Sequence, residues 1–289
     1  MSVKKAIIPL GGLATRFLPA SKAVPKGMFP VVDKPILQYI IEELSEAGVT
    51  DILLLVGRNN EAILNHFDKF PELNENLTRD GKFALLEKAE KPVNLARILY
   101  KRMYEPRGVA DVVMNARTFI GNDPFFMVYG DELFYNENSS SIKQMIDVYN
   151  QTQKAVVGCY SVDPKDVYKY GIMAIDNVDG ILNITHMVEK PKVEEAPSTL
   201  SAVGKYILNP DVFEVIEEVS KNFNKEKNFT EALNILAGQG KVVACDLKGE
   251  RYDTGSKLGY LLANVAYGLK DKEICEELKN NLITMLEEK

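Results

Sequence analysis

The alternation of apolar strands with an amphipathic helix at the start of the chain constrains the fold more than any other feature. Residues 4–10 (KKAIIPL) and 51–57 (DILLLVG) are short apolar runs typical of buried strands. Between them, residues 34–48 (KPILQYIIEELSEAG) carry apolar side chains at helical spacing and end at Gly48. A strand, a helix and a second strand in this order predict a βαβ unit, in which the two strands are parallel.

The same alternation continues through the first half of the chain. It predicts helices at 61–67, 74–90 and 141–151 and strands at 97–101 and 124–129. From residue 154 strand patterns dominate at 155–162, 180–190 and 200–208, which predicts a mixed sheet or a strand insert that covers one side of the parallel sheet. Helical patterns return at 211–219 and continue to the C-terminus. We predict a single α/β domain over residues 1–289, Rossmann-like and mostly parallel, with helices flanking the sheet.

Charge and residue usage exclude several classes of protein. The net charge of −6 argues against a nucleic-acid-binding surface, which normally carries a basic footprint. Apolar runs such as 52–56 are far too short for a signal peptide or a membrane span, so we expect a cytoplasmic protein without a membrane partner. The three cysteines are far apart in sequence and there are only two histidines, which disfavours a disulfide framework, a zinc cluster or a His-based relay.

The loop between the first strand and the first helix is the best candidate for a binding site. It lies at the carboxyl edge of the predicted parallel sheet, where open α/β sheets bind their ligands. Gly11 and Gly12 allow close approach of the backbone to a phosphate, and Arg16 and Lys26 add two cations on a proline-stiffened segment. The spacing fits neither a GxxxxGK[ST] loop nor a GxGxxG fingerprint. The loop therefore predicts an anionic ligand outside these two common nucleotide-binding classes.

The sequence of this loop resembles a family signature. Residues 11–39 (GGLATRFLPASKAVPKGMFPVVDKPILQY) resemble the pattern AGLGTRxLPxTKxxPKEMLPxVDKPxIQY of bacterial UTP–glucose-1-phosphate uridylyltransferases. The motifs EPRGVADVVMNAR, VYGDELF, YKYGIMAID, MVEKPK, NFTEAL and RYDTGSKLGY follow in family order through nearly the whole chain. The resemblance implies a sugar nucleotidyltransferase fold, a Mg²⁺ cofactor and a homodimer or homotetramer. It also implies a nucleotide-binding half at 1–153 and a sugar-binding half with the C-terminal helices at 154–289.

The resemblance implies a reaction and a role for each matching residue. Glucose 1-phosphate would attack the α-phosphate of UTP in line, giving UDP-glucose and pyrophosphate, so the site must offset charge on both reactants. Mg²⁺ typically takes one or two carboxylates together with phosphate oxygens. The implied roles are leaving-group binding by Arg16 and Lys26; nucleotide binding by Gly11, Gly12, Leu13, Ala14, Thr15, Met103 and Gly108; metal binding by Asp131 and Asp253; and sugar-phosphate binding by Gly171, Glu189, Lys190 and Gly204.

Departures from the family pattern concentrate on the nucleotide side. Ala14 replaces the second glycine of GLGTR and Gly27 replaces the glutamate of PKEM. If position 14 has a positive φ, alanine costs roughly 1–2 kcal/mol there unless the loop takes another path. Met103 stands for a glutamine that reads uracil, and a thioether offers only a weak acceptor to a base. The metal and sugar residues, in contrast, all match the family.

The second loop of the nucleotide side is also changed. Ala110 and Asp111 replace a Gly-His pair, and Arg107 would offset the added carboxylate if the two side chains face each other. We therefore hypothesise a uridylyltransferase with altered base recognition. The alternatives are the same chemistry with another nucleotide such as dTTP, and a catalytically weak paralogue that binds sugar nucleotides or regulates an active homologue.

Overall fold

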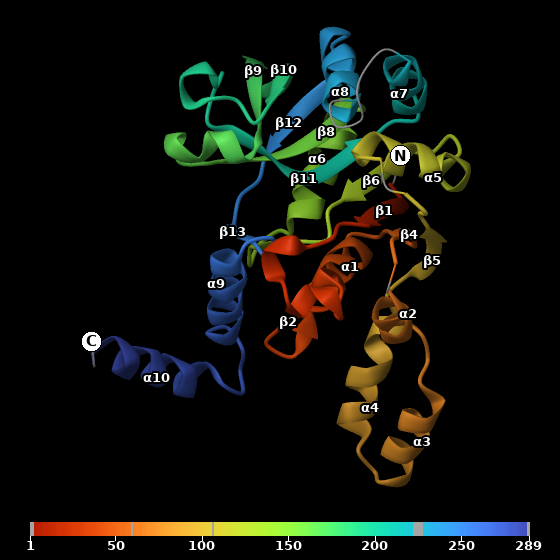
Figure 1. The fold of residues 1–289 in the computed structure, drawn as a ribbon, viewed down its shortest axis with the longest axis vertical. Coiled ribbons are helices and arrows are strands. Elements are labelled where there is room, and N and C mark those ends of the chain that lie inside the picture. Colours follow the sequence, from red (N-terminus) through yellow and green to blue (C-terminus); the bar gives the residue numbers. More distant parts are fainter. Residues whose placement is uncertain (1–2, 59, 106, 222–227, 288–289) are drawn as a thin grey trace.

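A mixed β-sheet forms the centre of the computed structural model, which describes residues 3–58, 60–105, 107–221 and 228–287 (Figure 1). In the described part of the chain the sheet has nine strands. Their spatial order is β5 (Arg97–Arg102), β4 (Asp51–Val56), β1 (Lys5–Leu10), β6 (Phe125–Val128), β11 (Leu200–Leu208), β8 (Ala155–Ser161), β12 (Val242–Asp246), β10 (Ile181–Glu189) and β9 (Gly171–Val178).

The parallel half of the sheet confirms the predicted βαβ unit. β1 pairs in parallel with both β4 and β6, and β4 pairs in parallel with β5. The carboxyl ends of β1, β4 and β6 therefore meet at one edge of the sheet, with the loop after β1 among them. This arrangement positions the candidate site at the edge predicted from the sequence.

The strands of the second half extend this sheet and do not cover one of its sides, as a separate strand insert would have done. β11 runs antiparallel between β6 and β8, and β10 is antiparallel to β12 and β9. The pairing of β11 with β8 is irregular between Ala202 and Tyr206, around Gly204, which has a φ of 62°. The sheet is continuous because β11 continues the backbone hydrogen bonding of β6 directly.

Helices cover both faces of the sheet and bury two apolar clusters. On one face lie α1 (Ile36–Glu46), α2 (Glu61–Phe67) and α6 (Ser141–Thr152), with Ile40 and Met145 fully buried. On the other face lie α5 (Val109–Ile120), α7 (Val212–Ser220) and α8 (Asn228–Gly238), with Val113 and Ile216 fully buried. The result is the three-layered α/β arrangement that the sequence predicts.

Two helical segments project from the body (Figure 1). The predicted helix at 74–90 is two helices, α3 (Pro71–Arg79) and α4 (Phe83–Glu90), because the chain turns at Gly81, whose φ is 68°. At the other end of the chain, α9 (Lys257–Gly268) leads to α10 (Cys275–Glu287), which lies away from the sheet. Among the described residues, no helix combines the length and the hydropathy needed to cross a bilayer.

Short elements near the carboxyl edge complete the fold. Three 3-10 helices follow β1: η1 (Thr15–Phe17), η2 (Ala20–Lys22) and η3 (Lys26–Met28). Further 3-10 turns are η4 (Lys91–Asn94), η5 (Pro164–Lys169) and η6 (Val193–Glu195). Two small antiparallel sheets pair β2 (Pro30–Val31) with β3 (Lys34–Pro35) and β7 (Glu132–Tyr135) with β13 (Glu250–Asp253). The second of these sheets brings residues that are far apart in sequence next to the loop after β1.

Candidate active site

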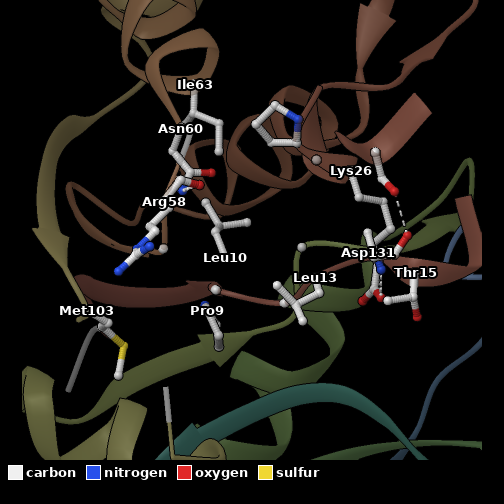
Figure 2. Close-up of a pocket in the computed structure, with 18 of the residues that line it drawn as sticks. Pro9, Leu10, Leu13, Thr15, Lys26, Arg58, Asn60, Ile63, Met103 and Asp131 are labelled. Carbon is white, nitrogen blue, oxygen red and sulfur yellow. Dashed lines mark hydrogen bonds and ion pairs between the residues drawn. The ribbon is translucent and has the colours of Figure 1, made fainter. Parts of the chain in front are cut away.

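A cavity of about 760 Å³ opens at the carboxyl edge of β1, β4 and β6 (Figure 2). Its lining comes from the loop after β1, from the segment after β4 and from the end of β6, and includes Met103 and Asp131. Figure 2 shows Arg58 and Met103 toward one end of the view and Lys26 and Asp131 toward the other. The lining therefore has Met103 and Arg58 at one end and the Lys26–Asp131 pair at the other.

The glycine-rich loop forms one wall of this cavity. Its lining members are the predicted nucleotide-binding residues Gly11, Gly12, Leu13, Ala14 and Thr15. Ala14 has φ 47° and ψ 40°, so this position does require a left-handed backbone, which costs alanine roughly 1–2 kcal/mol. Ser21 Oγ donates a hydrogen bond of 2.8 Å to the Ala14 carbonyl and holds the strained turn.

The wall near Met103 differs from the sequence expectation in two ways. Met103 lines the cavity but is only 5% exposed, and its backbone N–H donates to the Val56 carbonyl at 2.8 Å. The predicted loop at EPRGVAD is a helix from Val109 onward, because Gly108, with φ 97°, lets the chain turn into α5. Gly108 itself is outside the cavity lining, although Val109 lines it.

Arg107 does not offset Asp111 through its guanidinium group. That group pairs with Glu105 at 3.0 Å, while the backbone N–H of Arg107 donates to Asp111 Oδ2 at 3.3 Å. Asp111 lies in the first turn of α5, where a carboxylate is favoured by the helix dipole. The carboxylate that replaces the family histidine thus stabilises the start of a helix.

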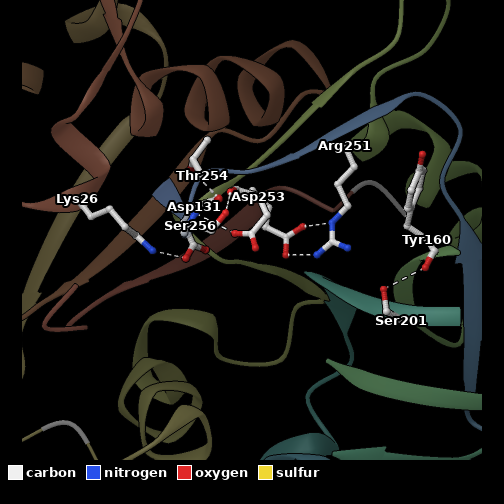
Figure 3. Close-up of polar contacts among 10 residues, drawn as sticks. Lys26, Asp131, Tyr160, Ser201, Arg251, Asp253, Thr254 and Ser256 are labelled. Carbon is white, nitrogen blue, oxygen red and sulfur yellow. Dashed lines mark hydrogen bonds and ion pairs between the residues drawn. The ribbon is translucent and has the colours of Figure 1, made fainter. Parts of the chain in front are cut away.

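The predicted metal residues Asp131 and Asp253 lie together (Figure 3). A Cβ atom placed on Gly255 would lie 2.8 Å from Asp253 Oδ1 and 3.1 Å from Asp131 Oδ2, so both oxygens are close to one point. Thr254 ties the two segments, since its N–H and its Oγ1 donate to the Asp131 carbonyl at 3.0 and 2.7 Å. Lys26 Nζ forms an ion pair with Asp131 Oδ2, and Gly255 N–H donates to Asp253 Oδ1 at 2.9 Å.

A buried ion pair behind the two aspartates fixes the β7–β13 sheet. Arg251 donates to both oxygens of Glu132 at 2.8 and 2.7 Å, and both side chains are largely buried. The Arg251 guanidinium also lies 4.8 Å from the centre of the Tyr170 ring. Burial raises the pKa of Glu132, and the hydrogen bonds from Arg251 act against this rise. Because Glu132 is next to Asp131 and pairs in register with Asp253, the ion pair holds both carboxylates in place.

The predicted sugar-phosphate residues form a second group at the end of β9 and β10. Gly171 and Glu189 are register partners, and a Cβ on Gly171 would lie 3.0 Å from Glu189 Oε2. Lys190 Nζ lies 3.3 Å from Glu189 Oε1, and its side chain is 64% exposed. Gly204 is next to the cavity wall, since its carbonyl accepts the N–H of Tyr129, which lines the cavity.

Arg16 is the one predicted residue on the phosphate side that the structure does not bring to Asp131. It lies exposed on η1, outside the cavity lining, and has no ion pair or hydrogen bond to any of the residues described. Sequence reasoning also missed Tyr129 and the Glu132–Arg251 pair. Tyr129 directly precedes Gly130 and Asp131 at the end of an apolar strand, which is the signal that could have drawn attention to it.

Comparison with known proteins identifies the family to which the chain belongs. The model of the nucleotidyl transferase family matches residues 5–268. A UTP–glucose-1-phosphate uridylyltransferase of Staphylococcus epidermidis is 41% identical over 278 residues, covering 96% of this chain and 96% of that protein. The chain belongs to the family of UTP–glucose-1-phosphate uridylyltransferases. A UTP–glucose-1-phosphate uridylyltransferase of Bacillus subtilis is 42% identical, over 96% of this chain and 94% of that protein.

A solved structure supports membership of the uridylyltransferase family. A UTP-bound UDP-glucose pyrophosphorylase of Acinetobacter baumannii superposes with a TM-score of 0.89 at 34% identity, covering 97% of this chain and 99% of that one. The similarity extends over both the cavity side and the sugar side of the sheet. The resemblance drawn from the sequence motifs is therefore confirmed.

The carboxylate pair of this family member fits a divalent cation. Two carboxylate oxygens converge there, and hard oxygen donors are the ligands that Mg²⁺ prefers. No group of three or more His, Cys, Asp or Glu side chains suited to a metal occurs among the described residues. A Mg²⁺ ion held there by these two carboxylates would take its further ligands from substrate phosphates and water.

Proposed function

We propose that the protein transfers the uridylyl group of UTP to glucose 1-phosphate. In this reaction an oxygen of the sugar phosphate attacks the α-phosphorus, the bond from that phosphorus to the bridging oxygen breaks, and pyrophosphate leaves. The observation that carries the proposal is that Lys26 and Asp131 line a cavity walled by the glycine-rich loop, with Asp253 beside Asp131. Family membership supports both the substrates and the products.

The residues of the chain act by binding and orienting the two anionic reactants. The loop at residues 11–15 would hold the triphosphate along the cavity, and Lys26 would exchange its contact with Asp131 for a phosphate oxygen. Asp131 and Asp253 would hold Mg²⁺, which offsets phosphate charge when it is bound. Arg16 lies exposed on η1 outside the cavity lining, so its proposed contact with the pyrophosphate requires η1 to move toward the ligand.

The predicted sugar-phosphate residues would hold glucose 1-phosphate. Lys190 is exposed and cationic and would bind the phosphate, while Glu189 would accept hydrogen bonds from the hexose. We further propose a homodimer or homotetramer in the cytoplasm. Sedimentation equilibrium tests the state of assembly, and a monomer at all concentrations would contradict it.

One direct experiment tests the proposed activity. Purified protein with Mg²⁺, UTP and glucose 1-phosphate should release pyrophosphate and form UDP-glucose. Parallel reactions with dTTP, CTP, ATP and GTP test nucleotide choice. Absence of turnover with every nucleotide would refute the proposal, and tight binding of UDP-glucose without turnover would favour the regulatory paralogue.

A second candidate activity is the same transfer from dTTP. The observation behind it is Met103, which lines the cavity and offers only a weak sulfur acceptor, so no strong hydrogen bond from this position selects UTP over dTTP. A higher kcat/KM for dTTP than for UTP would establish this alternative.

A further inference from the structure

Asn60 places a buried carboxamide in the wall of the cavity. Its side chain lines the cavity and is only 7% exposed. Figure 2 shows it beside Arg58, toward the end of the view that carries Met103. A Cβ atom placed on Gly57 would lie 3.9 Å from Asn60 Nδ2 and 3.4 Å from Gly11 Cα. The carboxamide therefore lies close to the start of the glycine-rich loop.

The chain fixes the orientation of this carboxamide. Asn60 Nδ2 donates a hydrogen bond of 3.0 Å to the Arg58 carbonyl. The Asn60 carbonyl accepts the N–H groups of Ile63 and Leu64 at 3.0 and 3.2 Å, which holds the backbone of this residue. A half-turn of the amide would place Oδ1 against the Arg58 carbonyl, and two acceptors form no hydrogen bond. The side chain therefore keeps Nδ2 on the Arg58 side.

The carboxamide keeps a donor and an acceptor without a partner. Among the described residues, the second N–H of Nδ2 and the oxygen Oδ1 form no hydrogen bond, and Oδ1 caps no N–H of α2. In the same ranges, Tyr100 Oη is the only fully enclosed side-chain atom without a partner, so Oδ1 is open to the cavity. Because buried polar groups are normally hydrogen-bonded, this unused pair points to a ligand.

A carboxamide in one fixed orientation distinguishes pyrimidine bases. Uracil presents an N3–H donor beside a carbonyl acceptor, so Oδ1 would accept from N3–H while the second N–H of Nδ2 donates to the carbonyl. Cytosine presents the reverse pattern, an acceptor N3 beside an amino donor, and would need the amide turned against the Arg58 carbonyl. Thymine presents the same edge as uracil. The fixed amide therefore matches uracil and thymine and rejects cytosine.

We propose that Asn60 determines nucleotide specificity by pairing with the N3–H and a neighbouring carbonyl group of a uracil or thymine base. This inference rests on the proposed function and names a base-reading residue for the same site. It provides a strong donor and acceptor in a cavity where Met103 offers only a weak acceptor. UTP and dTTP are therefore preferred over CTP.

Two Asn60 variants test the proposal through the ratio of kcat/KM for UTP over CTP. Asn60→Leu keeps the size of the side chain without its hydrogen-bonding groups and should lower the ratio about 5- to 150-fold, the preference carried by one bidentate pair with a base. Asn60→Asp should lower it at least as far, because a carboxylate repels a base carbonyl and accepts from the cytosine amino group. The ratio for dTTP over CTP should fall as well, with KM for glucose 1-phosphate unchanged.

Asn183→Leu is the matched control for the loss of an asparagine side chain. Asn183 Nδ2 also donates to the carbonyl two residues earlier, that of Ile181 at 3.2 Å, but Asn183 is outside the cavity lining. Its replacement removes the same kind of hydrogen bond and should leave both nucleotide ratios at the wild-type value. Circular dichroism checks folding, and if Asn60→Leu does not fold, the nearly isosteric Asn60→Asp decides by the same ratio.

The possible outcomes separate this inference from the proposed function. A UTP-over-CTP ratio in a folded Asn60 variant within twofold of the wild-type ratio, or an active wild type that uses CTP as well as UTP, would overturn the inference and leave the proposed function intact. If the wild type turns over no nucleotide, the proposed function fails and calorimetry with UTP and CTP decides the inference. Tighter binding of UTP than of CTP that is lost in the Asn60 variant supports it; equal or absent binding, or a preference that the variant retains, refutes it.

Discussion

Gly204 supports the Tyr129 ring, and replacing it with alanine should destabilise the protein strongly. The left-handed backbone, with φ 62°, costs alanine roughly 1–2 kcal/mol, and the contact at 2.6 Å with the Tyr129 ring adds about 1–3 kcal/mol of overpacking. Alanine also reduces the conformational freedom of the unfolded chain, which raises the free energy of unfolding by about 0.4–1 kcal/mol. We expect Gly204→Ala to lose about 2–4 kcal/mol in the free energy of unfolding.

Urea unfolding followed by circular dichroism measures this loss. Gly240→Ala is the matched control, because Gly240 has φ 69° but nothing within 4 Å of an added Cβ, so it should lose only about 1 kcal/mol. In a Tyr129→Ala background the extra loss at Gly204 should disappear, giving a coupling of about 1–3 kcal/mol. Equal losses for the two glycine variants would refute the packing of Tyr129 on Gly204.

Three further predictions concern the nucleotide wall, the strained loop and pH. Met103→Gln should raise the ratio of kcat/KM for UTP over CTP about 5- to 100-fold, because it provides an amide that can hydrogen-bond the base. Met103→Leu should leave this ratio unchanged. A wild-type ratio in Met103→Gln would show that the base lies away from residue 103. Ala14→Gly should relieve the left-handed backbone and stabilise the protein by about 0.5–1 kcal/mol, seen as a higher urea midpoint, and a lower midpoint would contradict the strain. Burial lowers the pKa of His66, whose ring donates to Gln38 at 2.8 Å, so the unfolded chain takes up the proton more readily and stability falls as pH drops below 6.5. His66→Gln should reduce the loss of melting temperature between pH 7.5 and 5.5, and an unchanged loss would exclude His66 as its source.

Continuous apolar runs and helical spacing predicted most elements of the fold correctly. β1, α1 and β4 follow from such patterns because each element buries most of its length in the sheet or against it. β7 and β13 were missed because they are short and half-exposed, so no apolar run marks them. The antiparallel direction of β11 was not predictable either, because periodicity shows which side of a strand is buried and not in which direction the strand runs.

The loop after β1 was predictable from its residues and its place in the chain, but the two aspartates of the candidate site were predictable only through the resemblance to the family. Asp131 and Asp253 are far apart in sequence, and the small β7–β13 sheet that joins them has no signature of its own. The positive φ of Ala14 followed from the glycine that it replaces. The pairing of Arg107 with Glu105 did not follow, because two exposed side chains choose their partners by geometry that a sequence does not contain.

Pyrophosphate release by aspartate variants tests the central claim most directly. The account predicts that Asp131→Asn and Asp253→Asn each lower kcat at least about 100-fold, with half-saturation shifted to higher Mg²⁺ concentration. Asp123→Asn, at an exposed carboxylate that pairs with Lys5 at 2.8 Å, should retain wild-type turnover. Wild-type kcat and Mg²⁺ dependence in either of the first two variants would contradict the claim that the two carboxylates share a metal ion in nucleotidyl transfer.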